Sequence, residues 1–281
     1  MKIIDKLAVV ILSFLISLFG FVVAICLFFF TTIGSPQFMI NVLESRGYYD
    51  LIYSDYSETI ENYAIPAGVG EGVFTACIPK DEFNADVNNI VLKAYSDSEE
   101  YAGEAYDYDG VYNRFYNCIV KVAEQQGIDV DQEVIPGIEN VSKLCADAYS
   151  TYVTVPFIDT IGSYSIEFGE ILSTVLVVAS AFGIFLIVLL LLSKQWRGKS
   201  PYYLTIASVA NGLMLIILPS VVLISGKIRH INIDIKSMYN FAVGYAEGMM
   251  WRLILIGAII ILIGVIISLC YQFIFKRKFI E

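Results

Sequence analysis

Four long stretches of uncharged, apolar residues decide what this chain can fold into. They cover residues 7–30, 171–192, about 203–224 and about 253–275. A helix as long as the first stretch spans about 36 Å at ~1.5 Å per residue, enough to cross the ~30 Å hydrocarbon core of a bilayer. Charged residues make up only 16% of the chain, against roughly 25% in soluble proteins. The sequence therefore predicts an all-α membrane protein built on a bundle of four transmembrane helices.

Residues 1–30 are predicted to form a short cytoplasmic N-terminus and the first membrane helix. Lys2 and Lys6 precede the apolar stretch, as they would in a secretory signal. The stretch is longer than the roughly 7–15 apolar residues of a cleaved signal peptide. We therefore expect an uncleaved signal anchor.

Lysines and arginines in the short connections set the expected orientation. The link 193–202 carries Lys194, Arg197 and Lys199, and the tail 276–281 begins with three basic residues. Basic residues in short loops stay on the cytoplasmic side. The sequence thus predicts a plasma-membrane protein with both termini in the cytoplasm and with segments 31–170 and 225–252 outside.

Segment 31–170 is predicted to form an acidic, helical domain inserted between the first two membrane helices. It contains 24 Asp and Glu against 6 Lys and Arg, and 14 of the 19 tyrosines. Such aromatic content favours a folded domain over a disordered loop. Caps, prolines and glycines predict its helices, at residues 36–46, 48–63, 80–95, 110–126 and 136–153, with a further helix after Pro156.

Small and polar residues within the membrane stretches are interpreted as packing positions. Small residues allow helix backbones to approach closely in a bilayer. A buried asparagine can bridge helices, and a proline kinks its helix. These positions are Ser13, Ser17 and Gly20 in the first stretch, Asn211 and Pro219 in the third, and Gly257 and Gly264 in the fourth.

The side chains needed for several chemistries are missing from the sequence. No Asp, Glu, Lys or His lies in the cores of the apolar stretches, where proton relays and ion pathways need ionisable groups. His230 is the single histidine, and the net charge of −10 argues against a nucleic-acid partner. We therefore expect neither an enzyme nor a cofactor.

Two acidic patterns space their oxygens as a calcium-binding loop does. They are Asp107 with Asp109, and Asp129 with Asp131 and Glu133. Neither completes the EF-hand pattern, because the glycine and the final glutamate are misplaced. These five residues are weak metal candidates, and solvated acidic loops are the favoured interpretation.

Cys77, Cys118 and Cys145 all lie in the predicted outer domain, where the surroundings are oxidising. Three cysteines allow one disulfide with three possible pairings. A bridge between Cys118 and Cys145 is slightly favoured, because it would join two predicted helices.

The second outer segment contains an alternating pattern. Ile231, Ile233 and Ile235 alternate with polar residues, which predicts a strand. A single strand needs a partner, so we expect it to lie against the outer domain. Its basic residues would then contact the acidic surface there; they are Lys227, Arg229 and Lys236.

The entry into the outer domain, residues 35–53, reads Ser-Pro, then an aliphatic helix, then Gly-Tyr-Tyr. In this stretch and in its order of parts the chain resembles uncharacterised four-helix integral membrane proteins of low-GC Gram-positive bacteria. The resemblance implies a membrane anchor leading into a helical outer domain and transfers no active site.

Three classes of function remain. The first is an interaction, sensing or assembly protein of the cell envelope, whose acidic domain binds a protein partner or ligand while the helices sit in the lipid bilayer. The second is a permease-like subunit of a transport complex. The permease of the cell-division ABC transporter also has four helices and a large outer loop, but it needs a cytoplasmic coupling helix for which the short inner segments leave little room. The third is an enzyme acting on lipid or cell wall at the outer interface.

Overall fold

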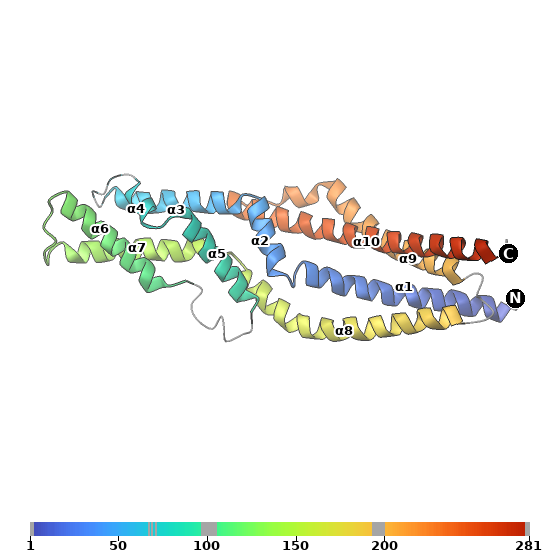
Figure 1. The fold of residues 1–281 in the computed structure, drawn as a ribbon. Coiled ribbons are helices and arrows are strands. Elements are labelled where there is room, and N and C mark those ends of the chain that lie inside the picture. Colours follow the sequence, from blue (N-terminus) through green and yellow to red (C-terminus); the bar gives the residue numbers. More distant parts are fainter. Residues whose placement is uncertain are drawn as a thin grey trace. The chain divides into compact units, whose positions relative to one another are not determined.

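The computed structural model describes residues 3–66, 68, 70, 72–96, 106–192 and 200–278. Every regular element within these residues is a helix (Figure 1). The chain divides into two compact units. We call residues 1–38, 167–232 and 243–281 the four-helix unit, and residues 39–166 and 233–242 the tyrosine-rich unit.

Four helices are long and apolar enough to cross a membrane, as predicted. They are α1 (Ile3–Thr31), α8 (Ile158–Leu192), α9 (Ser200–Ser225) and α10 (Lys236–Lys278). Many of their large apolar side chains are exposed, for example Phe14, Leu218 and Ile224. Apolar surface on this scale fits a lipid environment. The chain is therefore a multi-pass membrane protein.

Two of these helices begin well before the predicted membrane stretches. α8 starts at Ile158, because the helix predicted after Pro156 is continuous with the membrane stretch that begins at 171, and α10 starts at Lys236 rather than at 253. The predicted boundaries followed the loss of apolar character. A helix does not end there, because polar residues such as Glu167 and Glu247 have good helix propensity. The predicted outer loop 225–252 is consequently helical over more than half of its length.

The tyrosine-rich unit contains the predicted helices and one more. They are α2 (Pro36–Ser45, whose first residues belong to the four-helix unit), α3 (Tyr48–Ala64), α4 (Val73–Cys77), α5 (Lys80–Ala94), α6 (Tyr108–Gln125) and α7 (Ile135–Val153). Local signals explain the boundaries. The backbone N–H of Phe38 donates to Ser35 Oγ at 3.2 Å, and Gly47, with φ of 64°, separates α2 from α3. The five-residue α4 was not predicted.

Aromatic rings form the core of this unit. The Tyr56 ring on α3 stacks on Phe83 of α5 with centroids 5.1 Å apart, and Tyr149 of α7 meets both rings edge-on at 5.7 and 5.6 Å. All three side chains are fully buried. Such pairs add about 0.5–1.5 kcal/mol each beyond their burial. The tyrosines of the sequence thus hold α3, α5 and α7 together.

The prediction of a strand at 231–235 is wrong. Residues 227–230 form a 3-10 helix, residues 231–235 have no regular structure, and α10 begins directly after them. A strand must pair its backbone groups with a second strand, and none exists among the described residues.

The segment 233–242 does lie against the rest of the tyrosine-rich unit, but through helical residues. Asn240 Nδ2 donates to the Arg46 carbonyl at 3.4 Å, and the Phe241 ring packs edge-on against Tyr48 with centroids 6.1 Å apart. Two separate segments therefore build this unit, whereas the sequence predicted an insertion of residues 31–170 alone.

Candidate functional site

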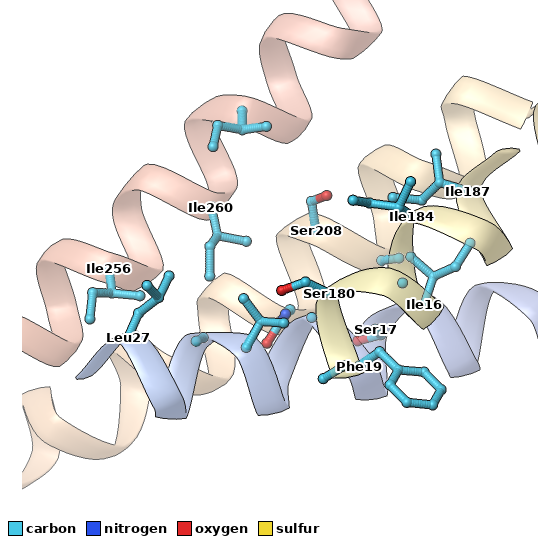
Figure 2. Close-up of a pocket in the computed structure, with 18 of the residues that line it drawn as sticks. Ile16, Ser17, Phe19, Leu27, Ser180, Ile184, Ile187, Ser208, Ile256 and Ile260 are labelled. Carbon is cyan, nitrogen blue, oxygen red and sulfur yellow. The ribbon is translucent and has the colours of Figure 1, made fainter. Parts of the chain in front are cut away.

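A pocket of about 470 Å³ lies among the four long helices (Figure 2). All of its lining residues belong to the four-helix unit and to the four candidate membrane spans. The lining is apolar, apart from three serine hydroxyls and one side-chain amide. It consists of Ile16, Ser17, Phe19, Gly20, Val23, Ala24 and Leu27 of α1, Ala179, Ser180, Gly183, Ile184 and Ile187 of α8, Ala207, Ser208 and Asn211 of α9, and Ile256, Ile259, Ile260 and Ile263 of α10.

The side-chain amide belongs to Asn211. Its side chain is only 3% exposed, and its Oδ1 has no hydrogen-bond partner. A Cβ built on Gly20 would lie 2.8 Å from Asn211 Nδ2. Asn211 was predicted as a residue that bridges helices. The structure places its amide against the backbone of α1 and leaves the oxygen unsatisfied.

Small residues bring α9 and α10 together next to the pocket. A Cβ on Gly257 would lie 2.7 Å from the Gly212 carbonyl oxygen, and a Cβ on Gly264 would lie 2.6 Å from Ser208 Cβ. Thr205 Oγ1 donates to the Gly264 carbonyl at 3.2 Å. Gly20, Gly257 and Gly264 thus lie where a larger side chain would meet a neighbouring helix.

The other predicted packing positions have varied surroundings. Ser13 Oγ donates to the Val9 carbonyl within its own helix at 2.9 Å, whereas Ser17 lines the pocket. Pro219 lies inside α9. Facing rings add a contact between α1 and α8, since Phe19 stacks on Phe182 with centroids 5.7 Å apart.

A second pocket, of about 460 Å³, lies on the tyrosine-rich unit where α3, α6 and α7 meet. We call it the outer groove. Exposed acidic residues flank its lining in sequence, namely Asp131, Glu133 and Glu139, together with the exposed Lys143. The lining residues are Tyr63, Pro66, Ile119, Val134, Gly137, Ile138, Asn140, Val141 and Leu144. Leu144 keeps 40% of its surface exposed.

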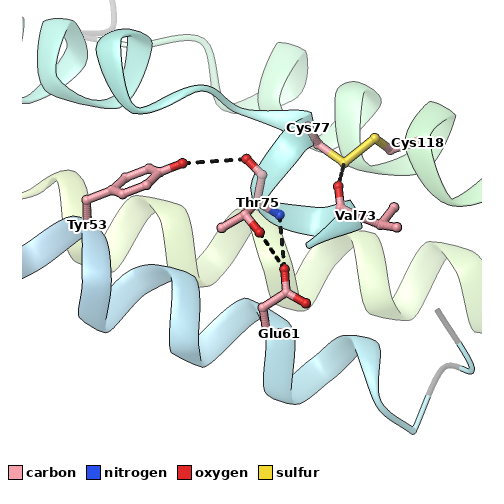
Figure 3. Close-up of a disulfide and its surroundings, with 6 residues drawn as sticks. All are labelled: Tyr53, Glu61, Val73, Thr75, Cys77 and Cys118. Carbon is pink, nitrogen blue, oxygen red and sulfur yellow. Dashed lines mark hydrogen bonds between the residues drawn. A yellow bond between two sulfur atoms is a disulfide. The ribbon is translucent and has the colours of Figure 1, made fainter. Parts of the chain in front are cut away.

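A disulfide joins Cys77 of α4 to Cys118 of α6, with Cα atoms 6.3 Å apart (Figure 3). The favoured pairing of Cys118 with Cys145 is therefore wrong, and Cys145 is a buried free thiol. Burial, and secondarily the Glu61 charge, raise the pKa of Cys145 to about 12. The short α4, which periodicity could not predict, is what carries Cys77 to α6.

Glu61 of α3 holds α4 in place (Figure 3). Its Oε2 accepts from the Gly72 backbone N–H at 3.0 Å, and its Oε1 accepts from the backbone N–H and the hydroxyl of Thr75 at 3.3 and 2.6 Å. These bonds satisfy backbone donors that the first turn of any helix leaves free. Tyr53 of α3 adds a bond to the Ile78 carbonyl at 3.2 Å.

Two residues of the calcium-like patterns accept backbone hydrogen bonds, Asp107 as the N-cap of α6 and Asp131 in the turn that precedes α7. Asp107 accepts from the Gly110 N–H at 2.9 Å, and Asp131 accepts from the N–H groups of Glu133 and Val134 at 3.0 and 3.2 Å. Asp109 lies in the first turn of α6, and Asp129 is exposed in the following loop. Within the described ranges, no group of three or more His, Cys, Asp and Glu is arranged to hold a metal ion.

The basic residues of the second outer segment lie near the ends of α9 and α10. Arg229 Nε donates to Glu247 Oε1 at 2.7 Å, and Glu247 is only 7% exposed. Lys227 and Lys236 are exposed. The acidic run 97–105 and the basic residues of 193–199 lie outside the described residues.

Sequence reasoning missed the outer groove and two serines of the membrane pocket, Ser180 and Ser208. The available signal for the serines was a polar side chain in an otherwise apolar helix. Comparisons with protein-family models, with curated proteins and with solved structures find no match for this chain. Functional inference therefore depends on the two pockets and the charge pattern.

Proposed function

We propose that this chain is an interaction or sensing protein of the cell envelope that binds a partner protein through the outer groove. The observation that carries the proposal is a largely apolar groove whose lining residues are flanked in sequence by exposed carboxylates. Leu144, Val141 and Ile138 offer apolar contact, while Asp131, Glu133 and Glu139 lie within a few residues of them. A partner segment with an apolar anchor flanked by Lys or Arg complements both features.

The proposal includes a location and an orientation. The tyrosine-rich unit is placed outside the plasma membrane, and the basic segments 193–202 and 276–281 are placed in the cytoplasm. The Cys77–Cys118 disulfide supports this placement, because disulfides persist in oxidising compartments. The basic residues of short loops support it independently. A protease added to intact cells should therefore cut within residues 31–170 and spare 193–202.

Site-specific photocrosslinking of the full-length protein in its native membrane tests the partner. A photoreactive residue at position 144 should form an adduct whose partner peptide carries Lys or Arg, with a yield that falls in high salt. The same residue at Ala85, exposed on α5, is the matched control. Leu144→Glu should weaken capture of the partner, because it adds a charge to an apolar contact.

Two results would contradict this function. Adducts of equal yield from positions 85 and 144 would remove the groove as the docking site. Recovery of a stoichiometric cytoplasmic ATPase would instead favour the permease-like alternative. We also propose kinship with four-helix membrane proteins of Gram-positive bacteria, on the basis of residues 35–53.

A further inference from the structure

The pocket among the four long helices points to a second binding site, which does not depend on the outer groove. Asn211 is the tenth residue of the candidate span Tyr202–Ser225, and Gly20 is the fourteenth of Leu7–Thr31. Both therefore lie close to the middle of their spans. A side-chain amide at this depth is remote from the water that would normally satisfy it.

The unsatisfied Asn211 oxygen makes burial of this amide in the middle of the span unfavourable in free energy. A buried polar group without a hydrogen bond loses free energy relative to water, and hydrocarbon offers no substitute partner. The amide can reverse its two ends by rotating about its terminal bond. A group that both donates and accepts a hydrogen bond, such as a hydroxyl or a secondary amide, therefore satisfies it in either orientation.

The rest of the lining limits what can enter. The lining residues are apolar apart from Asn211, Ser17, Ser180 and Ser208, and none of them carries an ionisable side chain. A charged headgroup would have no counter-charge there. The part of the ligand inside the pocket is accordingly uncharged, with one polar group and a larger apolar body.

The shape of the pocket favours a slender molecule over a helix from a second copy. From Ile16 to Leu27, α1 rises about 16 Å, so a volume of about 470 Å³ gives a mean cross-section of roughly 30 Å². A helix with side chains, 10–12 Å across, needs roughly 80–110 Å². A volume of this size also falls in the ~300–1,000 Å³ range of small-molecule sites.

We propose that this pocket binds an uncharged, lipid-like amphiphile, an apolar chain or ring system whose single hydroxyl or amide group hydrogen-bonds to Asn211. Ser17 of α1, Ser180 of α8 and Ser208 of α9 provide further hydrogen-bonding positions in the lining. This proposal assigns a class of ligand to the four-helix unit. The partner protein proposed above binds the tyrosine-rich unit instead.

The test uses the full-length protein reconstituted in phosphatidylcholine vesicles. The probe is a sixteen-carbon alcohol with a photoreactive diazirine near its hydroxyl end, and the comparison probe is the same chain without the hydroxyl. The alcohol should label peptides of α1 and α9 that contain Gly20 and Asn211. Asn211→Leu should reduce labelling by the alcohol about tenfold, the value of one hydrogen bond in an apolar site. Labelling by the hydrocarbon should stay the same.

Two further variants keep the test decisive. Ser180→Phe fills the pocket without altering Asn211 and should abolish labelling by both probes. Leu218→Ala changes an α9 residue that is 66% exposed and does not line the pocket. It should leave labelling by both probes unchanged. Should Asn211→Leu fail to fold, Ser180→Phe still tests whether the probe binds in the pocket. The comparison of the two probes still tests whether the hydroxyl contributes to binding.

Three outcomes would overturn the proposal. Equal labelling by the two probes in the unmodified protein would show that the hydroxyl has no specific partner. Labelling that persists in Ser180→Phe would place the probe on the lipid-facing surface. Covalent dimers formed through a photoreactive residue at Ser180 would show that a second copy of the chain occupies the pocket.

Discussion

The side chain of Asn211 in α9 packs against Gly20 in α1 so closely that a Cβ on residue 20 would lie 2.8 Å from Nδ2. Real Cβ atoms do not approach other atoms this closely, so Gly20→Ala must displace the amide. Overpacking of this kind typically costs about 1–3 kcal/mol. We expect Gly20→Ala to lower the thermal stability of the detergent-purified protein.

Gly169→Ala is the matched control, because a Cβ at Gly169 in α8 meets nothing within 4 Å. Both substitutions gain the ~1 kcal/mol of helix propensity that separates alanine from glycine. Their difference therefore isolates the contact with Asn211. Equal melting temperatures for the two variants would show that α1 and α9 do not meet at these residues.

The disulfide between Cys77 and Cys118 should be a major source of stability for the tyrosine-rich unit. It joins residues separated by 41 positions. Closure of loops of ~15 and ~100 residues is worth about 3 and 4.7 kcal/mol, so about 4 kcal/mol is expected here. Cys77→Ser with Cys118→Ser should lower the urea midpoint accordingly and speed proteolysis within residues 39–166.

Cys270→Ser provides the control for that experiment, because Cys270 is a free and exposed cysteine. Its urea midpoint should match that of the unmodified protein. Peptide mapping without reduction should recover Cys77 linked to Cys118. Recovery of a Cys118–Cys145 peptide would contradict the structure and restore the pairing that the sequence favoured.

The helices of the tyrosine-rich unit could be predicted because their signals are local. Ser35 and Pro36 begin α2, Gly47 ends it, and Gly127 with φ of 73° follows α6. Each signal acts within one turn of the chain. The alternation at 231–235 failed for the opposite reason, since a strand depends on a partner that no local pattern can supply.

The pockets could not be predicted from local patterns in the sequence. Asn211 stood out as a polar residue in an apolar helix, but its missing hydrogen bond depends on how three other helices are rotated toward it. The disulfide partner of Cys118 likewise depends on Glu61, which anchors the five-residue α4 that carries Cys77. Hydropathy is enough to predict the candidate membrane spans. The pockets and the disulfide depend on contacts between residues that are distant in the sequence.

Cys145 should be nearly inert to thiol reagents in the folded protein. Its side chain is fully buried, and burial, with the Glu61 charge second, raises its pKa to about 12. At pH 8 only about one thiol in ten thousand is then the reactive thiolate. Labelling of Cys145 with N-ethylmaleimide should be undetectable in the native protein and rapid in urea. Rapid labelling without urea would show that α7 does not pack on α3 as described.

Asp86 should make the stability of the tyrosine-rich unit depend on pH. Burial raises the pKa of this carboxyl above its ordinary value, against the lowering effect of the hydrogen bond from Tyr149. The folded state thus holds the proton more tightly than the unfolded chain. The resulting stabilisation is present below the unfolded pKa of ~3.9 and is lost as the pH rises through the folded pKa.

Asp86→Asn keeps an acceptor for Tyr149 and removes the partly buried charge. Its free energy of unfolding should exceed that of the unmodified protein at pH 7, and the difference should shrink as the pH falls toward 4. Urea unfolding of the two proteins at several pH values measures this. A difference that grows at low pH would mean that the folded state favours the ionised carboxylate.

Tyr149→Phe should extend the pH-dependent loss of stability that arises from Asp86 to higher pH. The Tyr149 hydroxyl donates to Asp86 Oδ2 at 2.5 Å, and this bond favours the charged form of the carboxyl. Without it the pKa of Asp86 rises further, so the loss of stability with rising pH, which begins near the unfolded pKa in both proteins, should end at a higher pH than in the unmodified protein. Combining Tyr149→Phe with Asp86→Asn should cancel that displacement, because no titrating group then remains at position 86. A displacement that survives in the double variant would have to arise at another residue and would remove Asp86 as its source.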